Sequence, residues 1–242
     1  YLYPFFIMTT VAIHQPNYLP WLPYFRKIVN SDIFVFFDNV QMPGGKSFVN
    51  RVSINISGNQ HWLTVPISSK GEGVLLKDST ISGSYWSDKH IKTLKLSYSY
   101  SKWSYMIDDY LAPVYLKNYT NIADLNISLI HVVLKILKVD TVKLIRASEI
   151  NGVGEGYKSI YKILKSLNAD TYITGNGKGT QRSIDSNKLN SIGIDSKYIS
   201  SDNLEYLGIR YKFIPSLSVV DALLNLGPEA VKDLLFNHAY YD

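Results

Sequence analysis

The sequence contains no cysteine among its 242 residues. It therefore has no disulfide, no thiolate metal site and no cysteine nucleophile, and such a composition is typical of a reducing compartment. No stretch approaches the roughly 20 consecutive apolar residues that a membrane span requires. We expect a cytoplasmic protein with no membrane span.

The net charge is small and histidine is scarce. The 25 Lys and Arg residues exceed the 20 Asp and Glu residues by a net +5, and no run of like charges occurs. Because nucleic-acid binders usually concentrate basic residues on one face, this spread indicates a solvated basic surface, with at most a mild attraction for phosphate-bearing substrates. The five histidines lack ligand spacing, so we expect no zinc or iron site. The sequence does not decide whether magnesium binds together with a nucleotide.

The chain is expected to form one domain. Its hydrophobic fraction of 46% and charged fraction of 19% are ordinary for a globular protein with a sizeable core. Tyr1–Ile7 is apolar, lacks a basic start and precedes Met8, so residues 1–8 are interpreted as an extension and residues 9–242 as the domain.

Two apolar runs in the first part of the chain predict buried strands. They are Val11–Ile13, which ends in His14, and Ile33–Phe37, which ends at Asp38. Continuous apolar residues of this kind are typical of strands covered on both faces. Prolines punctuate the loop between them, and a helix is predicted over Tyr24–Val29.

Residues 48–138 change the pattern twice. Over residues 48–81 apolar and polar residues alternate around a Gly58-Asn59 turn, which predicts a β-hairpin insertion, with a further strand over Leu75–Ile81. Over residues 86–138 apolar residues recur at three and four positions, which predicts a helical segment. His131 lies on that apolar stripe, where we expect a packed core histidine.

The second half alternates strands and helices. Ser218 and Asp221 have the spacing of a capping box before a helix that Gly227 ends and Pro228 follows. The whole order predicts an α/β fold, with a Rossmann-like, mainly parallel sheet, a β-hairpin insertion and a helical middle segment. The remaining predicted elements are the strands Val142–Ile145 and Tyr172–Thr174 and the helices Tyr157–Leu167 and Lys188–Ile192.

The carboxyl ends of the predicted strands select the candidate site, because ligands of open α/β sheets bind there. The three segments are His14 to Asn17, Asp38 to Gln41 and Gly175 to Gly179. The first is the most informative, because a tight turn requires neither a histidine nor three prolines. In the last, glycines and Lys178 suit a phosphate, although a flexible surface loop explains them equally well.

These segments resemble the WbqC-like family, whose members occur among bacterial O-antigen and other polysaccharide genes. The motifs are HQPNYLPW, YFRKI, SDIFVFFDNVQ, NR, HWLTVPI and the closing FIPSLSVVDALLNLG, with weaker matches at Trp86, His90, Tyr172 and Gly175. The resemblance covers essentially Thr9 to Leu235. It departs at Pro23, where the family usually has glycine, and the GNGKG stretch is not matched.

The resemblance implies a transferase that attaches an acyl or aminoacyl group, with glycine proposed, to the amine of a nucleotide-linked amino sugar in surface-polysaccharide biosynthesis. Such a transfer needs a base, donors for an oxyanion and a cradle for the diphosphate. We assign His14 as the base, because histidine titrates near neutral pH. Asp38 is expected to orient His14 or to hold the substrate ammonium, and Asn17 to donate to the oxyanion. The expected substrate-binding residues are Gln15, Tyr18, Gln41, Asn50, Arg51 (on a phosphate), Trp62, His90, Gly175 and Lys178.

Several alternatives stay open. Trp62 suits a core position as well as an aromatic wall, and His90 suits the surface as well as the cleft. The acyl donor is glycyl-tRNA, a carrier thioester or ATP with free glycine. His14 with Asn17 after a strand also resembles, remotely, the histidine motif of nucleotidylyltransferases and pantoate ligases, which makes an ATP-dependent ligase the second hypothesis. The third is a non-catalytic sugar-nucleotide binding protein.

Overall fold

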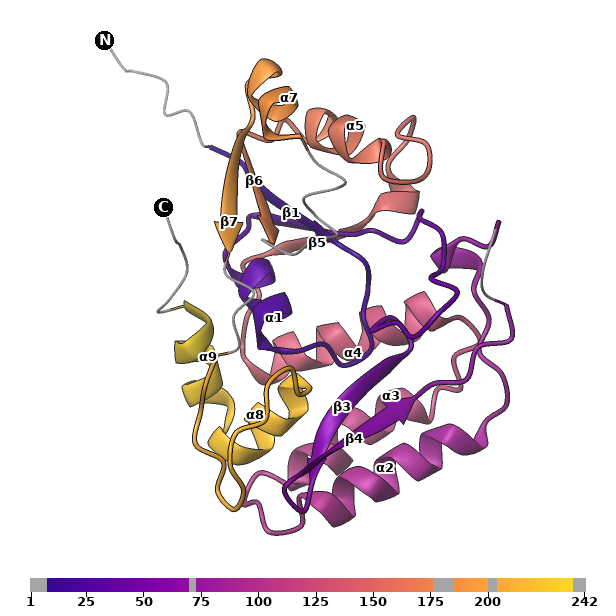
Figure 1. Ribbon diagram of the computed structural model, residues 1–242, viewed down its shortest axis with the longest axis vertical. Coiled ribbons are helices and arrows are strands. Elements are labelled where there is room, and N and C mark those ends of the chain that lie inside the picture. Colours follow the sequence, from indigo (N-terminus) through magenta and orange to yellow (C-terminus); the bar gives the residue numbers. More distant parts are fainter. Residues whose placement is uncertain (1–7, 70–72, 176–184, 200–203, 237–242) are drawn as a thin grey trace.

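The structure is a computed structural model that describes residues 8–69, 73–175, 185–199 and 204–236 (Figure 1). Lys178 and the rest of the glycine-rich stretch after Gly175 lie outside the described residues. So do residues 1–7, which were interpreted as an extension.

A five-stranded, all-parallel sheet forms the centre of the fold, in the order β5-β2-β1-β6-β7 (Figure 1). The Rossmann-like α/β fold predicted from the sequence is confirmed. Strand β7 was not predicted, because its polar DSKYI sequence lacks an apolar run; such residues are typical of an exposed edge strand. The strands are β1 Thr10–His14, β2 Ile33–Phe36, β5 Lys143–Arg146, β6 Thr171–Gly175 and β7 Asp195–Ile199.

Helices cover both faces of the sheet, because side chains of successive strand residues point to opposite sides. Ala12 belongs to the larger apolar cluster, with α1, α4 and α8, whereas Val11 belongs to a smaller cluster with α5 and α7. The helices are α1 Leu22–Val29, α2 Tyr85–Ser97, α3 Ala112–Tyr115, α4 Ile122–Ile136, α5 Ser159–Ser166, α7 Ser186–Ser191, α8 Val219–Leu226 and α9 Pro228–Phe236, with 3-10 helices at Leu76–Asp78 and Ala147–Glu149 and a π-helix at Ile107–Leu111.

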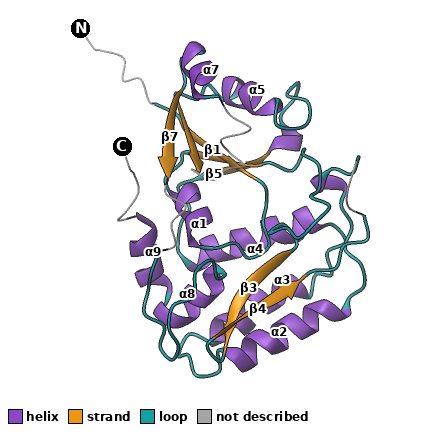
Figure 2. Ribbon diagram, viewed as in Figure 1, coloured by secondary structure: helices purple, strands orange, loops and turns teal. Residues whose placement is uncertain are grey.

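The predicted hairpin forms a separate antiparallel pair of strands, β3 Arg51–Ile56 and β4 Asn59–Thr64 (Figure 2). Its inward side chains Val52, Ile54 and Leu63 belong to the same large cluster as Ala12 of the parallel sheet. The two sheets therefore share one hydrophobic core.

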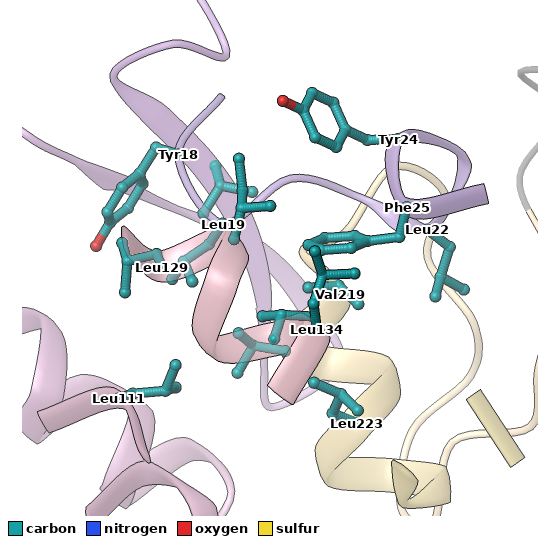
Figure 3. Packing of buried hydrophobic residues seen from close by; sticks show 14 of the residues in the cluster. Tyr18, Leu19, Leu22, Tyr24, Phe25, Leu111, Leu129, Leu134, Val219 and Leu223 are labelled. Atoms are coloured by element: carbon teal, nitrogen blue, oxygen red, sulfur yellow. The ribbon is translucent and has the colours of Figure 1, made fainter. Parts of the chain in front are cut away.

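The loop after β1 is anchored in that core. Tyr18 and Leu19 are fully buried, and their side chains gather with those of α1, α4 and α8 (Figure 3). The loop after β1 therefore buries its apolar residues in the core, whereas His14 lies at the end of β1.

Two expectations about single elements were wrong. Leu75–Ile81 forms a 3-10 helix at Leu76–Asp78 with isolated bridges at Leu75 and at Thr80 and Ile81, instead of a strand. His131 is exposed and not in the core, because it lies at the margin of the apolar stripe of α4.

The capping-box interpretation of Asp221 was also wrong, although Ser218 caps α8 through Val220 N–H at 3.2 Å. The buried Asp221 carboxylate instead accepts hydrogen bonds from the hydroxyls of Tyr98 and Tyr206. Burial raises the pKa of Asp221. Two distant tyrosines override the local capping pattern, and no sequence spacing predicts that.

Candidate functional site

His14 ends β1 and is half-buried. Its Nδ1 lies 3.0 Å from the carbonyl oxygen of Gln15. Because a carbonyl only accepts hydrogen bonds, Nδ1 carries the proton and Nε2 carries the lone pair. Within the described residues Nε2 has no hydrogen-bond partner, so the imidazole offers an acceptor at the carboxyl edge of the sheet.

The His14 ring is neutral at physiological pH. Burial, and then the charge of Lys27, lower the pKa of His14 to about 3. Lys27 is itself buried on α1 and donates to the carbonyl oxygen of Ile13 at 3.3 Å, and burial lowers its pKa to about 8. The expectation that His14 titrates near neutral pH was therefore wrong: burial and a cation beside it outweigh its ordinary value.

A chain of partly exposed rings leads from His14 to the hairpin. Ring centroids are 6.4 Å apart for His14 and Trp21, 4.7 Å for Trp21 and Phe48, and 6.1 Å for Phe48 and Trp62. The guanidinium carbon of Arg51 lies 3.9 Å from the centroid of Trp62. We call these five residues the aromatic row. They join three predicted site residues, His14, Arg51 and Trp62, from two separate parts of the fold.

Trp21 and Phe48 were missed as candidates from the sequence. Phe48 is 38% exposed and Trp21 is half-buried. Aromatic residues in polar loops that contain proline or glycine could have indicated a binding surface, because large rings are mostly buried on average. Their mutual distance depends on tertiary contacts and cannot be read from the sequence.

Asn126 of α4 holds the two loops of the row together. Its fully buried amide nitrogen donates to the carbonyl oxygens of Pro16 at 2.8 Å and Val49 at 2.7 Å. The backbone N–H of Tyr18 also donates to the carbonyl of Phe48 at 3.0 Å. The loop after β1 and the segment before β3 therefore have a fixed spacing.

Asp38 does not take the place that the sequence suggested. Its carboxylate is fully buried and accepts from Arg146 Nε at 2.7 Å, from Ser148 N–H at 2.9 Å and from Ser148 Oγ at 2.7 Å. Both oxygens are thus occupied, and no hydrogen bond between the described side chains joins Asp38 to His14. Asp38 therefore neither orients His14 nor is free for a substrate ammonium.

Arg146 is a site-edge residue that the sequence analysis missed. It lies in register with Phe36 of β2, which pairs with His14, so its Cα is two strands, about 10 Å, from that of His14. Its guanidinium joins Asp38 to Asp124 of α4 at 2.6 Å. The strand-end rule would have found it, because it directly follows the predicted strand at 142–145.

Tyr18 and His90 form a buried network and do not face a ligand. The Tyr18 hydroxyl lies 2.8 Å from His90 Nδ1 and also contacts the Tyr115 hydroxyl. Tyr18 is fully buried and His90 is 4% exposed, and burial lowers the pKa of His90 to about 4. The expected direct contact of these two residues with substrate is not supported by their burial.

The remaining candidates are not part of the aromatic row. The Gln15 carbonyl accepts from Tyr24 as well as from His14. Asn17 is 3% exposed, and its amide has no hydrogen bond to a described residue. The Asn50 amide is buried and donates to Val65, Gln41 is exposed and bridges to Leu75, and Gly175 ends β6 next to β1.

Two classes of feature are not found in the described part of the chain. No group of three or more His, Cys, Asp or Glu side chains there is placed to hold a metal ion. None of the helices there is long and apolar enough to cross a membrane.

The fold defines an α/β protein, and the carboxyl ends of its parallel sheet carry a polar and aromatic candidate site. The chain belongs to the WbqC-like protein family, whose model matches residues 15–233. It is 28% identical over 226 residues to the uncharacterized protein Rv1507c of Mycobacterium tuberculosis (strain ATCC 25618 / H37Rv), covering 92% of this chain and 96% of that relative. No solved structure matches the chain.

Proposed function

We propose that the protein transfers an acyl or aminoacyl group, with glycyl as the first choice, to the amine of a nucleotide-linked amino sugar in surface-polysaccharide biosynthesis. The observation that carries this proposal is the neutral His14 ring at the carboxyl edge of the sheet, whose Nε2 lone pair has no partner among the described residues. Family membership supports it.

His14 acts on the amine only after attack begins. An imidazole with a pKa of about 3 is too weak a base to deprotonate a free ammonium, so the amine must arrive uncharged. As the amine forms the new C–N bond, its nitrogen becomes positively charged and more acidic than a free ammonium. Nε2 then accepts that proton and returns it to the departing group of the donor.

The developing oxyanion needs nearby donors. The Asn17 side-chain amide follows His14 by three positions and has no intramolecular partner among the described residues. We assign Asn17 this role, with Gln15 beside it; because Asn17 is 3% exposed, the assignment requires that substrate binding expose its amide. Lys178, which lies outside the described residues, and Gly175, which ends β6 next to β1, remain proposed substrate-binding residues.

The acyl donor separates this proposal from its nearest alternative. Glycyl-tRNA or a carrier thioester already holds an activated acyl group, whereas an ATP-dependent ligase uses ATP with Mg²⁺ and free glycine. Consumption of ATP that depends on both glycine and the amino sugar would favour the ligase. A sugar-nucleotide binding protein would bind substrate without product from any donor.

The test is the activity of His14→Ala and His14→Gln with UDP- and dTDP-linked amino sugars and each donor, with products measured by mass spectrometry. Because positioned proton transfer typically contributes 10²–10⁴-fold, we expect about that loss in both variants, with unchanged circular dichroism. His131→Ala, which changes an exposed histidine on α4, is the matched control and should keep full activity. Full activity in His14→Ala would refute the assignment.

A further inference from the structure

We infer that the hairpin end of the aromatic row binds a nucleoside diphosphate, with the phosphates on Arg51 and the base against Trp62 and Phe48. The inference rests on the proposed function for the identity of the attached sugar. It adds which residues bind the nucleotide and in which direction the substrate lies.

Arg51 has the geometry of an anion site. Its guanidinium lies over the Trp62 ring at 3.9 Å, and it forms no ion pair or hydrogen bond with any described residue. Arg146, in contrast, is bound by the carboxylates of Asp38 and Asp124. Stacking leaves the N–H donors of Arg51 in the plane of the guanidinium, where they can hold two phosphate oxygens at once.

Phe48 and Trp62 supply flat apolar surface next to that cation. Phe48 is 38% exposed although Trp21 and Trp62 flank it. Its ring is tilted by 52° to Trp21 and by 44° to Trp62, so the rings form an angled surface and not a closed stack. A nucleobase that packs on such rings typically gains about 1–3 kcal/mol.

The combination selects the chemical class of the ligand. A free sugar would use the rings but has no phosphate for Arg51, and inorganic pyrophosphate would use Arg51 but not the rings. A nucleoside diphosphate carries both a planar base and anionic oxygens. Because His14 lies at the opposite end of the row, the nucleotide binds at the hairpin and the amino sugar points toward the imidazole.

Asn126 makes this surface preformed. It joins the Pro16 and Val49 carbonyls, which belong to the loops that carry Trp21 and Phe48. Little conformational entropy is then lost when the ligand binds, which favours affinity.

The test is calorimetric titration of the whole protein with UDP, dTDP, GDP and ADP, with inorganic pyrophosphate and the matching nucleoside as partial ligands. We expect at least one nucleoside diphosphate to bind more tightly than pyrophosphate. For that ligand, Trp62→Ala should raise Kd by about 5- to 150-fold, the loss expected for one stacked base, and Trp62→Phe should restore most of the affinity. Arg51→Gln should weaken the diphosphate but leave nucleoside binding unchanged.

Tyr85→Ala is the control, because Tyr85 is 91% exposed and lies on α2, outside the row. It should leave every Kd unchanged. Equal Kd values for the wild type and Trp62→Ala, pyrophosphate binding as tight as the diphosphate, or no nucleotide binding would each overturn the inference. If nucleotide binding requires Trp62 but the protein has no transferase activity, the inference holds and the proposed function is refuted. If the protein has transferase activity but Trp62→Ala leaves Kd unchanged, the proposed function holds and the inference is refuted.

Discussion

The buried ammonium of Lys27, next to His14, lowers the stability of the fold. It is 7% exposed, its ammonium contacts the Ile13 carbonyl, and no carboxylate pairs with it among the described side chains. Burying an unpaired cation is unfavourable, and the lowering of its pKa from 10.5 to about 8 reflects this. Burial, and then the charge of Lys27, lower the pKa of His14, so the lysine helps to keep the imidazole neutral.

We therefore predict that Lys27→Met stabilises the fold near neutral pH. Because the folded-state pKa is depressed, the unfolded state binds more protons between pH 8 and 10.5, so the wild type recovers stability as the pH rises through that window and carries the full penalty below it. Allowing for the lost hydrogen bond, the gain in unfolding free energy at pH 7 should be about 1–3 kcal/mol.

Urea unfolding of both proteins at pH 7 and pH 10 measures this difference. The gain should shrink at the higher pH, and the pKa of His14, followed by NMR, should rise in the variant. A variant less stable than the wild type at pH 7 would show that the ammonium has a stabilising partner.

Residue-scale prediction from the sequence succeeded where position along a strand decides the outcome. His14 was placed at the end of β1 because an apolar run stops there. Arg146 ends β5 in the same way, but the sequence analysis did not name it. It failed where distant partners decide: the sequence contains no sign that Asp38 would bind Arg146 or that Asp221 would bind Tyr98.

At the scale of elements, α4 connects the loops on which the candidate site depends. We predict that Asn126→Leu costs about 2–4 kcal/mol of stability, because it leaves the Pro16 and Val49 carbonyls without their donor in a buried region. It should also weaken nucleotide binding, because the two loops of the aromatic row are no longer held together.

Leu129→Ala on the same helix is the matched control. Leu129 is fully buried, so its truncation costs a comparable amount, about 2–5 kcal/mol, without touching either carbonyl. Thermal unfolding gives the stabilities, and calorimetry at a temperature where both variants are folded gives Kd. If both variants bind the nucleotide with equal affinity, Asn126 contributes to the stability of the fold and not to nucleotide binding.

The elements themselves were predictable to different degrees. Strands β1 and β2 follow from continuous apolar runs, and β5 and β6 follow from short, mainly apolar stretches. The hairpin follows from alternation around a glycine turn. Strand β7 and the 3-10 helix at Leu76–Asp78 were not predicted. Edge strands bury little, and short 3-10 turns have no period of their own, so neither leaves a hydrophobic pattern.

At the scale of the whole molecule, the parallel sheet and the hairpin depend on the same core. Ile54 of β3 and Phe34 of β2 are both fully buried members of one apolar cluster, to which α4 and α8 contribute. An isolated two-stranded hairpin is marginally stable in water, so β3 and β4 owe their stability to this shared packing.

The protein should therefore unfold in one cooperative transition, in which the hairpin and the parallel sheet are lost together. Ile54→Ala should remove about 2–5 kcal/mol and lower Tm by about 2–4 °C for each kcal/mol. Phe34→Ala should behave alike, although the two residues lie in different sheets. Far-UV and near-UV circular dichroism should give coincident melting curves for the wild type and both variants. A separate early transition in Ile54→Ala, with hydrogen exchange rising in the hairpin while β1 stays protected, would show that the hairpin is an independent unit and that the site at the aromatic row is assembled from two separately folding parts.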